Sequence, residues 1–372
     1  MKAWPVLGIF LIQVLLFLAH WFLFRSWTAF WPGLGATVQF NLQVALLVLS
    51  FSFVVSALLS FRFSNFAVTF FYKIAAIWLG FLNFIFYGAW LTWLAWYVIR
   101  AFGAPNRHEL LSGIADGFLV LAVMTGIYGL LNARIIRVRR VPVRLPNLPE
   151  SWRGRRAVLM SDLHLGNVNG VHFCRRMTLL AAGLNPDIVF IPGDLFDGTI
   201  ANLDKLIAPL KELAAPFGIY FSTGNHEEFH DPASYVQAIS RIGIRVLANE
   251  RVTVDGLHIL GIPDSDLSYP IRVKATLDKL SPGAGEASIL INHAPIRLPI
   301  VEQAGISLQV SGHTHGGQII PYTWVTRRIF GPFTSGLHRF GALQVYTSTG
   351  AGTWGPPMRV GAQPEIVVLE FE

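Results

Sequence analysis

Four long apolar runs occupy the first 135 residues of this 372-residue chain and restrict what its N-terminal part can become. The runs cover approximately residues 4–24, 38–60, 74–98 and 113–133. Each is long enough to supply the ~20 apolar residues that cross the hydrocarbon core of a bilayer. We therefore predict a membrane domain of about four transmembrane helices in residues 1–135. The third run is apolar from residue 66 onward apart from Lys73 and Asn83, so five spans are the alternative interpretation.

The charged residues divide the chain into two parts of different character. Residues 1–145 contain 11 Lys and Arg against two Asp and Glu, whereas residues 146–372 contain 18 against 20. The net charge of +7 therefore comes from the first part alone. A folded domain that binds nucleic acid needs a basic face, so we expect no nucleic-acid partner. The basic residues instead flank the apolar runs, which is typical of membrane proteins.

The same charges predict the orientation of the helices. With four spans and a cytoplasmic N-terminus, the inner segments carry eight basic residues and the outer loops carry three. The positive-inside rule favours this orientation. The single cysteine, Cys174, fits a reducing compartment because it cannot form an internal disulfide. We therefore expect a multi-pass protein of the inner (cytoplasmic) membrane with a cytosolic C-terminal domain, whereas an odd number of spans would place that domain outside.

From residue 156 onward, short β-rich runs alternate with helical stretches. The expected strands are 157–161, 188–192, 218–222, 244–248, 252–254, 257–262, 288–292, 308–311, 343–347 and 366–371. The expected helices are 171–184, 203–215, 232–242, 273–280 and 298–304. This alternation indicates parallel βαβ units, and the closely spaced strand pairs indicate antiparallel portions. We expect residues 156–372 to form an α/β sandwich of helix-covered sheets, with residues 136–155 as a basic juxtamembrane linker.

Five of the expected strands run directly into groups of metal-ligand side chains. The groups are Asp162-Leu163-His164, Gly193-Asp194, Gly224-Asn225-His226-Glu227, His293-Ala294 and Gly312-His313-Thr314-His315. Ligands of open α/β sheets bind beyond the carboxyl ends of the strands, so residues far apart in sequence can meet there. Turn or capping chemistry explains any one group alone, but five groups after five strands indicate one site. Mixed imidazole and oxygen donors suit Mn, Fe or Zn, and a pair of such ions can clamp a phosphate.

The order of these groups resembles that of the calcineurin-like metallophosphoesterase superfamily over approximately residues 155–320. The stretches Gly350-Ala351-Gly352-Thr353, Pro357-Met358-Arg359 and Pro364-Glu365-Ile366 resemble a bacterial subgroup in which membrane spans precede the phosphoesterase domain. The resemblance implies a four-layer α/β/β/α sandwich that holds two divalent metal ions.

The resemblance also implies a role for each of eight side chains. Asp162, His164 and His315 would bind one ion. Asp194 would bridge to the second ion, which Asn225, His293 and His313 would complete. His226 would be the general acid that assists the leaving group. We expect Asp197 to support the ligands from behind or to cap a turn, and Glu227 to be a surface residue or to form local hydrogen bonds.

The activity implied by the resemblance is hydrolysis of a phosphoester by a water that two metal ions activate. The membrane domain would bring the site close to the bilayer, so a phospholipid headgroup or a nucleotide-linked lipid is a candidate substrate. The alternative function is a membrane receptor or scaffold that uses the phosphoesterase fold for binding only. That alternative predicts missing ligands, and none of the seven is missing.

Overall fold

The computed structural model describes residues 3–102, 106–229 and 231–372, and the chain divides into two compact units. The first, which we call the membrane unit, is Met1–Leu130 with Gly355–Met358. The second, which we call the sandwich unit, is Leu131–Trp354 with Arg359–Glu372. The chain therefore passes from one unit to the other after residues 130, 354 and 358.

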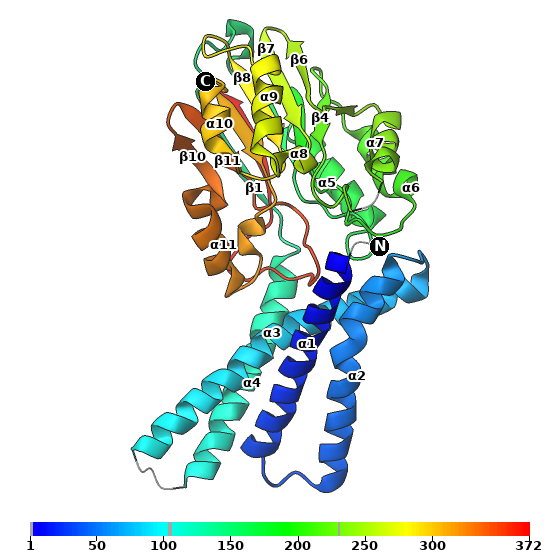
Figure 1. The fold of residues 1–372 in the computed structure, drawn as a ribbon, viewed down its shortest axis with the longest axis vertical. Helices are drawn as coiled ribbons and strands as arrows, with labels where there is room; N and C mark the ends of the chain where they lie inside the picture. Colours follow the sequence, from blue (N-terminus) through cyan, green and yellow to red (C-terminus); the bar gives the residue numbers. More distant parts are fainter. Residues whose placement is uncertain (1–2, 103–105, 230) are drawn as a thin grey trace. The chain divides into compact units, whose positions relative to one another are not determined.

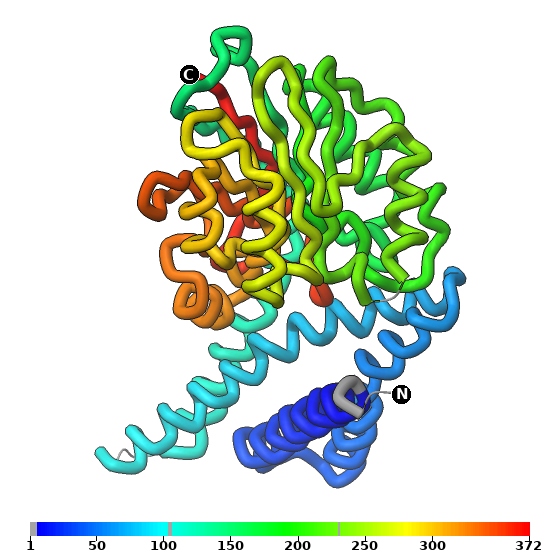
Figure 2. The backbone as a smooth tube through the Cα atoms, turned by 45° about the horizontal axis from the view of Figure 1, so that its top comes forward, coloured from blue at the N-terminus to red at the C-terminus, as the bar shows by residue number. Residues whose placement is uncertain are grey.

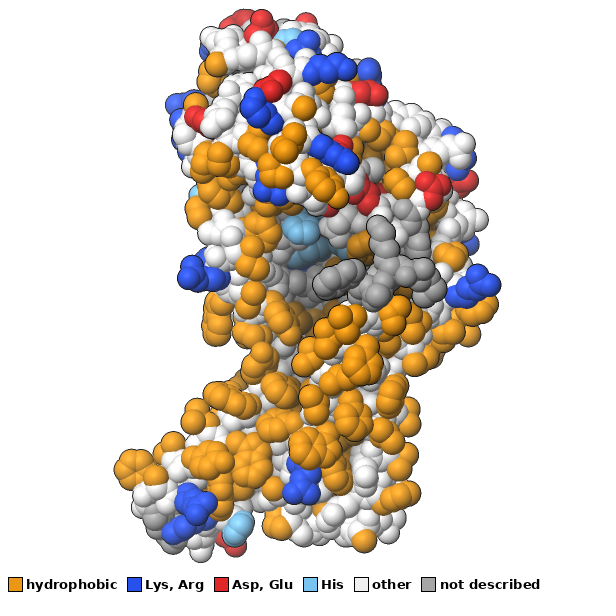
Figure 3. Space-filling view, viewed as in Figure 1, with side chains coloured by type: hydrophobic (Ala, Val, Ile, Leu, Met, Phe, Trp, Pro, Cys, Tyr) orange, Lys and Arg blue, Asp and Glu red, His pale blue; other side chains and the backbone are white. Residues whose placement is uncertain are grey.

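Four helices begin the chain, each long and apolar enough to cross a membrane. They are α1 (Ala3–Phe30), α2 (Ala36–Ser60), α3 (Phe66–Ala101) and α4 (Arg107–Asn132). Because α3 is continuous through Lys73 and Asn83, the apolar segment from residue 66 is one helix. The described residues thus contain four helices that could span a membrane, the number that the apolar runs predicted. Apolar side chains cover most of the surface of these helices in the space-filling view (Figure 3).

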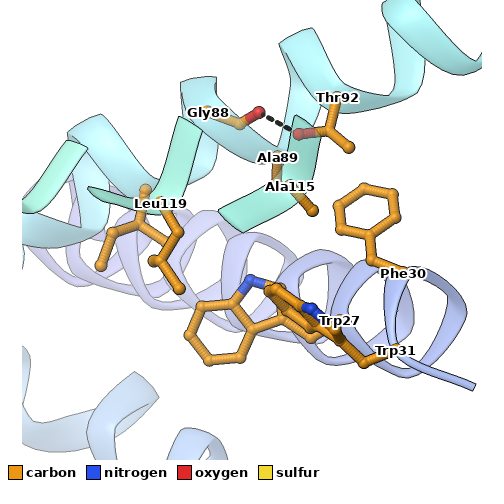
Figure 4. Close-up of a pocket in the computed structure, with 9 residues that line it drawn as sticks. Trp27, Phe30, Trp31, Gly88, Ala89, Thr92, Ala115 and Leu119 are labelled. Atoms are coloured by element: carbon orange, nitrogen blue, oxygen red, sulfur yellow. Dashed lines mark hydrogen bonds between the residues drawn. The ribbon is translucent and has the colours of Figure 1, made fainter. Parts of the chain in front are cut away.

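Small residues and a few polar side chains hold the membrane helices together. A Cβ on Gly88 would lie 3.2 Å from the carbonyl oxygen of Phe118, so α3 and α4 pack closely there. Trp93 of α3 donates a hydrogen bond to Ser26 of α1 at 2.9 Å. Both are common devices between helices in lipid. A pocket between α1, α3 and α4 is lined by Trp27, Phe30, Trp31, Ile85, Gly88, Ala89, Thr92, Ala115 and Leu119 (Figure 4).

The sandwich unit contains two six-stranded sheets. The first has the order β1-β12-β2-β3-β4-β5 and the second β10-β11-β9-β8-β7-β6. The strands of the first sheet are β1 (Arg137–Val143), β2 (Arg156–Leu159), β3 (Ile188–Pro192), β4 (Ile219–Ser222), β5 (Arg245–Val246) and β12 (Glu365–Phe371). Those of the second are β6 (Glu250–Val254), β7 (Leu257–Ile262), β8 (Ser288–Asn292), β9 (Leu308–Ser311), β10 (Gly336–Phe340) and β11 (Leu343–Thr347). Strands β2, β3, β4 and β5 are mutually parallel, as are β7, β8, β9 and β11.

Alternate residues of the central strands face different layers. In β3, Ile188 and Phe190 pack between the two sheets, whereas Val189 and Ile191 pack against helices on the outer face. This alternation follows from the period of two in a strand. The helices on the first sheet are α5 (Val171–Ala182), α6 (Leu203–Ile207) and α7 (Pro232–Arg241), and those on the second are α9 (Pro270–Leu280) and α10 (Leu298–Gln303) (Figures 1 and 2). The predicted α/β fold, with two sheets between helical layers, is confirmed.

Shorter elements complete the sandwich unit. They are η1 (Glu150–Trp152), η2 (Ala208–Glu212), α8 (Asp264–Leu267), η3 (His315–Gly317), α11 (Tyr322–Phe330) and η4 (Gly331–Thr334). Of these, η3 and α11 follow the end of β9 and are important for the site described below.

The segment that we expected to be a linker, residues 136–155, contains an ordered strand. Arg137–Val143 forms β1, which pairs in parallel with β12 over seven residue pairs. Three arginines of the segment form ion pairs with acidic residues near the C-terminus, at 2.7–2.9 Å: Arg139 with Glu365, Arg140 with Glu370 and Arg144 with Glu372. The partner strand lies more than 200 residues away in sequence, and this explains why a local pattern of basic residues did not predict β1.

Candidate metal centre

The predicted site residues all follow the carboxyl ends of parallel strands. Asp162 and His164 follow β2, Asp194 follows β3, Asn225 and His226 follow β4, His293 follows β8, and His313 and His315 follow β9. Because β2, β3 and β4 are neighbours in one sheet and β8 and β9 in the other, these ends meet at one edge of the sandwich. The structure brings all seven predicted ligands and His226 together there. Histidine side chains are visible at the surface of this unit (Figure 3).

One group of donor atoms comes from the loops that follow β2 and β9. The Nε2 atoms of His164 and His315 lie 2.9 Å apart, and Nε2 of His315 lies 3.6 Å from Oδ1 of Asp162. The three residues have ligand atoms within 4.8 Å of one another, so they could share a metal ion. The backbone N–H of His313 donates to Oδ1 of Asp162 at 2.9 Å, which ties the two loops together.

A second group forms a nearly equilateral triangle of donor atoms. Oδ1 of Asn225 lies 3.1 Å from both Nε2 of His293 and Nδ1 of His313, and the two nitrogens are 3.2 Å apart. Donor atoms that share a cation at about 2.1 Å are separated by roughly 3.0–3.4 Å. Nδ1 of His293 lies 2.8 Å from the carbonyl oxygen of Pro192. Donation to that carbonyl fixes the ring so that Nε2 faces the triangle and is the nitrogen that would bind a cation.

Asp194 lies between the two groups. Its Oδ2 atom is 3.1 Å from Nε2 of His293 and 3.8 Å from Nε2 of His164. Its other oxygen, Oδ1, accepts the backbone N–H of His226 at 3.0 Å, and this orients the carboxylate. A carboxylate in this position suits the bridging role that the family resemblance implies.

The ligands are held by unusual backbone geometry. Five of the seven have a positive φ: Asp162 (53°), His164 (46°), Asp194 (49°), His313 (69°) and His315 (50°). Non-glycine residues seldom adopt this region, and such outliers are concentrated at functional sites. The flanking glycines are equally constrained. A Cβ on Gly193, whose φ is 84°, would lie 2.6 Å from backbone atoms of Gly224.

Burial keeps three of the histidines neutral. It lowers the pKa of His164 and His315 well below the ordinary value, with smaller contributions from the neighbouring charges of His226 and Arg359 respectively. Burial, followed by His293, lowers the pKa of His313 to about 4. The neutral imidazole is the form that binds metals. These three side chains are therefore prepared for metal binding at neutral pH.

The acidic groups and His293 depend on one another. Burial raises the pKa of Asp162 to about 6. Burial alone would raise the pKa of Asp194, but His293 and His164 lower it below its usual range. In turn, Asp194 raises the pKa of His293 well above its ordinary value in spite of burial. The two buried carboxylates, Asp162 and Asp194, lie in one cluster, and a bound cation would neutralise their negative charge.

His226 stands beside the donor groups with its ring fixed. Its Nδ1 atom lies 2.8 Å from the carbonyl oxygen of Asp197 and donates to it, so Nε2 is the free nitrogen. The ring centre is 4.6 Å from that of His164 and 4.5 Å from that of Phe229. Asp197 accepts hydrogen bonds from Asn167 and from Thr199, which agrees with the turn-capping role expected of it.

Glu227 has a larger part in the structure than its sequence position indicated. It is fully buried, and its carboxylate accepts the backbone N–H groups of Asp194, Phe196 and Gly224 at 2.8–3.0 Å. Burial, followed by the charge of Asp194, raises its pKa to about 8. Glu227 therefore joins the loops after β3 and β4. Its position directly after Asn225-His226 was the available signal, but burial is a tertiary property.

Arg359 is a buried residue for which sequence analysis assigned no role. Its guanidinium donates to the carbonyl oxygens of His315, Gly350 and Gly352 at 2.8, 3.2 and 2.6 Å. Its Nη2 atom also lies 3.1 Å from Nδ1 of His315. Arg359 thus holds the loop after β9 against the segment after β11. Its backbone oxygen accepts a hydrogen bond from Asn132 at 2.9 Å.

The residues present fit a pair of divalent cations. The donor set is mixed imidazole, carboxylate and amide, which suits Mn, Fe or Zn. Three groups of described residues have the spacing of metal ligands: Asp162 with His164 and His315, His164 with Asp194 and His226, and Asp162 with Asp194 and His293. His226 is in one of these groups although we expected it to be an acid and not a ligand. Its bond to the carbonyl oxygen of Asp197 is equally compatible with either role.

Comparisons with known proteins agree with this chemistry. The profile of the calcineurin-like phosphoesterase family matches residues 155–317. A "transmembrane protein with metallophosphoesterase domain" of Danio rerio is 32% identical over 320 residues, which are 78% of this chain and 72% of that protein. An uncharacterized metallophosphoesterase of Campylobacter jejuni is 31% identical, with 68% of each chain covered. Among solved structures, a dimetal phosphatase of Danio rerio matches with a TM-score of 0.38 and 12% identity over 59% of this chain and 100% of that chain.

Proposed function

The chain belongs to the calcineurin-like metallophosphoesterase family and is a membrane protein with a metal-dependent phosphoesterase domain, and we propose that it hydrolyses phosphoesters at the edge of the bilayer. The observation that carries the proposal is the convergence of the seven predicted ligands and His226 after five strands. They approach one another from both sheets of the sandwich. No single sheet, and no short stretch of sequence, could assemble this set.

We assign the ligands as follows. Asp162, His164 and His315 hold one ion, Asp194 bridges, and Asn225, His293 and His313 complete the second position. When bound, the two ions would supply charge neutralisation to the phosphate and a water of lowered pKa. The chain itself fixes the donors, because the ring of His293 is oriented by Pro192 and the carboxylate of Asp194 by the backbone of His226.

His226 is proposed to give a proton to the leaving oxygen. Its Nδ1–H is committed to the carbonyl oxygen of Asp197, so Nε2 is the nitrogen that can carry the transferred proton. Its backbone N–H holds Asp194, so the position of the acid is tied to that of the bridging carboxylate.

The test of this function is hydrolysis by the detergent-solubilised full chain with Mn²⁺ added. Simple aryl phosphomonoesters and phosphodiesters report the reaction class. We expect turnover that is abolished by a chelator and restored by a divalent metal. Absence of turnover on both ester classes and on lipid phosphoesters, in protein that binds metal, would overturn the proposal.

His226→Ala separates acid catalysis from metal binding. We expect turnover of an ester with a poor leaving group to fall by ~10²–10⁴-fold, whereas an activated aryl ester is affected less. Metal content, measured on the same protein, should be unchanged. His258→Ala is the matched control, because His258 is a histidine of β7 that pairs with Glu286 away from the site. Loss of metal in the His226 variant would make His226 a ligand instead.

We further propose that the substrate is amphiphilic, either a phospholipid or a nucleotide-linked lipid. Two large apolar side chains, Trp354 and Phe229, are about half exposed next to His226. Their ring centres lie 5.9 and 4.5 Å from that of His226. Exposed aromatic groups beside a phosphate-binding centre suit a phosphoester that carries a hydrocarbon chain.

The assay for this preference compares esters with the same headgroup and different acyl length. We expect the long-chain ester to have the higher kcat/KM in mixed micelles at equal surface concentration. Equal kcat/KM for the long-chain and the water-soluble short-chain ester would contradict a lipid substrate while leaving the phosphoesterase activity intact.

We propose the inner (cytoplasmic) membrane as the location and the cytosol as the side of the sandwich unit. The support is the excess of basic residues in the segments that would face the cytosol. A reporter fused after Glu372 tests the side directly. Fluorescence of a green fluorescent protein fusion supports the cytosol, whereas activity of an alkaline phosphatase fusion supports the opposite side.

A further inference from the structure

Helix α11 turns three large apolar side chains outward, unlike an ordinary surface helix. None of its nine residues is buried. Trp324, Val325 and Ile329 are 70%, 51% and 69% exposed. At 100° per residue these three lie within one arc of the helix, whereas Thr323 and Thr326 lie on the opposite side. A helix that only covered a protein core would turn its apolar side inward.

Two arginines accompany the apolar arc. Arg327 and Arg328 are exposed, and within the described part of the chain neither guanidinium forms a hydrogen bond or an ion pair. By angle, Arg328 lies between Trp324 and Val325, and Arg327 lies at the border of the arc. Exposed Trp, aliphatic and Arg side chains on one helix are typical of segments that lie in the membrane interface.

The position of α11 in the sandwich unit brings it close to the point where the chain leaves its last membrane span. Asn132, the final residue of α4, donates to the backbone oxygen of Arg359. The next residues, Val360 and Gly361, form bridges with Ile319, and the backbone N–H of Ile320 donates to Val360 at 3.0 Å. Helix α11 begins two residues later, at Tyr322.

These contacts form a short chain of neighbours from the end of α4 to the start of α11. Because α4 is long and apolar enough to span the membrane, its last residue marks a membrane surface. Within the sandwich unit, one side-chain and one backbone hydrogen bond therefore connect α11 to the residue at which the chain comes from its last apolar helix.

We propose that the outer face of α11, formed by Trp324, Val325, Arg328 and Ile329, lies in the headgroup region of the bilayer that holds the chain's own helices. The apolar side chains enter the boundary with the acyl chains, and Arg327 and Arg328 contact lipid phosphates. Anionic lipids strengthen the contact, since basic side chains near such a surface are attracted to its negative charge. This surface does not depend on which substrate is hydrolysed.

The contact would also set the height of the metal centre above the lipid. Helix α11 follows η3, which contains the predicted ligand His315, by four residues. At its other end, the ring centre of Phe330 lies 6.1 Å from that of His313. Docking of α11 therefore holds the loop after β9 at a defined distance from the headgroups.

A fluorescent probe on the helix tests the proposal in the full chain. The Ile329→Cys variant is labelled with an environment-sensitive NBD group. The native Cys174 is fully buried, and wild-type protein treated with the same reagent checks that this thiol does not react. The labelled protein is reconstituted in vesicles of phosphatidylcholine and phosphatidylglycerol that contain doxyl-labelled lipid. Ile271→Cys on α9 is the matched control, because Ile271 is an aliphatic residue that is 85% exposed on another helix of the same unit.

We expect the Ile329 probe to be blue-shifted and quenched by doxyl lipid several-fold more strongly than the Ile271 probe. Soluble iodide should show the reverse order. Equal lipid quenching at the two positions would overturn the proposal. So would protection of the Ile329 probe that persists in detergent and is accompanied by energy transfer between labelled chains, because the face would then be an interface between two copies.

Charge substitution tests the lipid class. In the Ile329 probe background, Arg327→Gln with Arg328→Gln should lower doxyl quenching in vesicles that contain phosphatidylglycerol and reduce the difference from pure phosphatidylcholine. The exposed pair Arg175 and Arg176 on α5, changed in the same way, is the control and should have no effect. If both pairs change quenching equally, the effect is general electrostatics and the assignment of α11 is wrong.

Discussion

Replacement of Arg359 by methionine removes a buried cation that joins the metal-binding loop to the rest of the fold. The guanidinium donates to three backbone carbonyls, those of His315, Gly350 and Gly352, and the contacts with the two glycines are buried. Methionine fills a similar length of space but donates no hydrogen bond. The carbonyl oxygen of Gly352 would then lack its donor, whereas those of His315 and Gly350 keep the backbone N–H groups of Gln318 and Glu365. His315 would lose the side chain that holds its loop.

The magnitude follows from these contacts. A buried acceptor left without its donor costs about 1–3 kcal/mol. Only the carbonyl of Gly352 is left without a donor, and removing a buried charge also removes its desolvation cost, so we expect a net loss of stability of about 1–3 kcal/mol. Partners that orient a metal ligand typically contribute 10–100-fold to affinity, and we expect a loss of about that size for the ion held by Asp162, His164 and His315.

The assay is metal titration of the full chain in detergent, with thermal unfolding measured in chelator and in metal. We expect weaker binding of one ion, while the ion assigned to Asn225, His293 and His313 is retained. Arg359→Lys should restore part of the affinity, because an ammonium can reach one or two of the carbonyls.

Arg297→Met is the matched control. Arg297 also donates to two backbone carbonyls, those of Leu267 and Ser268, but it makes no contact with the predicted ligands. It should lower the melting temperature without a change in metal affinity. If Arg359→Met binds both ions with wild-type affinity, Arg359 does not position His315 and the reasoning is refuted.

Three further predictions concern the site and the core. Asp194→Asn should abolish activity and leave at most one tightly held ion by metal analysis; two retained ions would contradict the bridge. Gly312→Ala should lower metal content and stability because its Cβ would collide with Ser161, whereas Gly170→Ala, with open space around the Cβ, should match wild type in the same measurements. Burial raises the pKa of Cys174 to about 12 from an ordinary value of 9.0, so the native thiol should resist iodoacetamide up to pH 10. Its contribution to stability is complete below pH 9 and is lost as the pH rises toward 12, which is measurable as a falling melting temperature.

Strands buried on both faces were the most predictable elements. The bounds expected for 188–192, 257–262, 288–292, 308–311 and 343–347 agree with β3, β7, β8, β9 and β11. These strands are rich in Val, Ile and Leu, and polar residues or glycines follow them, so their ends are marked in the sequence. The edge strands β1 and β10 were missed. Strand β1 contains three arginines, and its place in the sheet depends on a strand from the other end of the chain.

The metal centre, like the fold, could be predicted only in part. The convergence of the ligands could be predicted because the topology of parallel strands brings their carboxyl ends together. The left-handed backbone of Asp162 and His313, the buried carboxylate of Glu227 and the guanidinium of Arg359 could not. Each depends on neighbours from other strands, and the sequence around each shows a polar residue with no indication that it will be buried.

The order of the first sheet has a consequence for how the protein is made. Strand β12 is the last strand of the sandwich unit to be synthesised, yet it lies between β1 and β2, which are the first two. Strands β1 and β2 therefore lack the strand that pairs with both of them until more than 200 further residues have been added. The first sheet can therefore be completed only after β12 has been synthesised, when all four helices of the membrane unit have already been made.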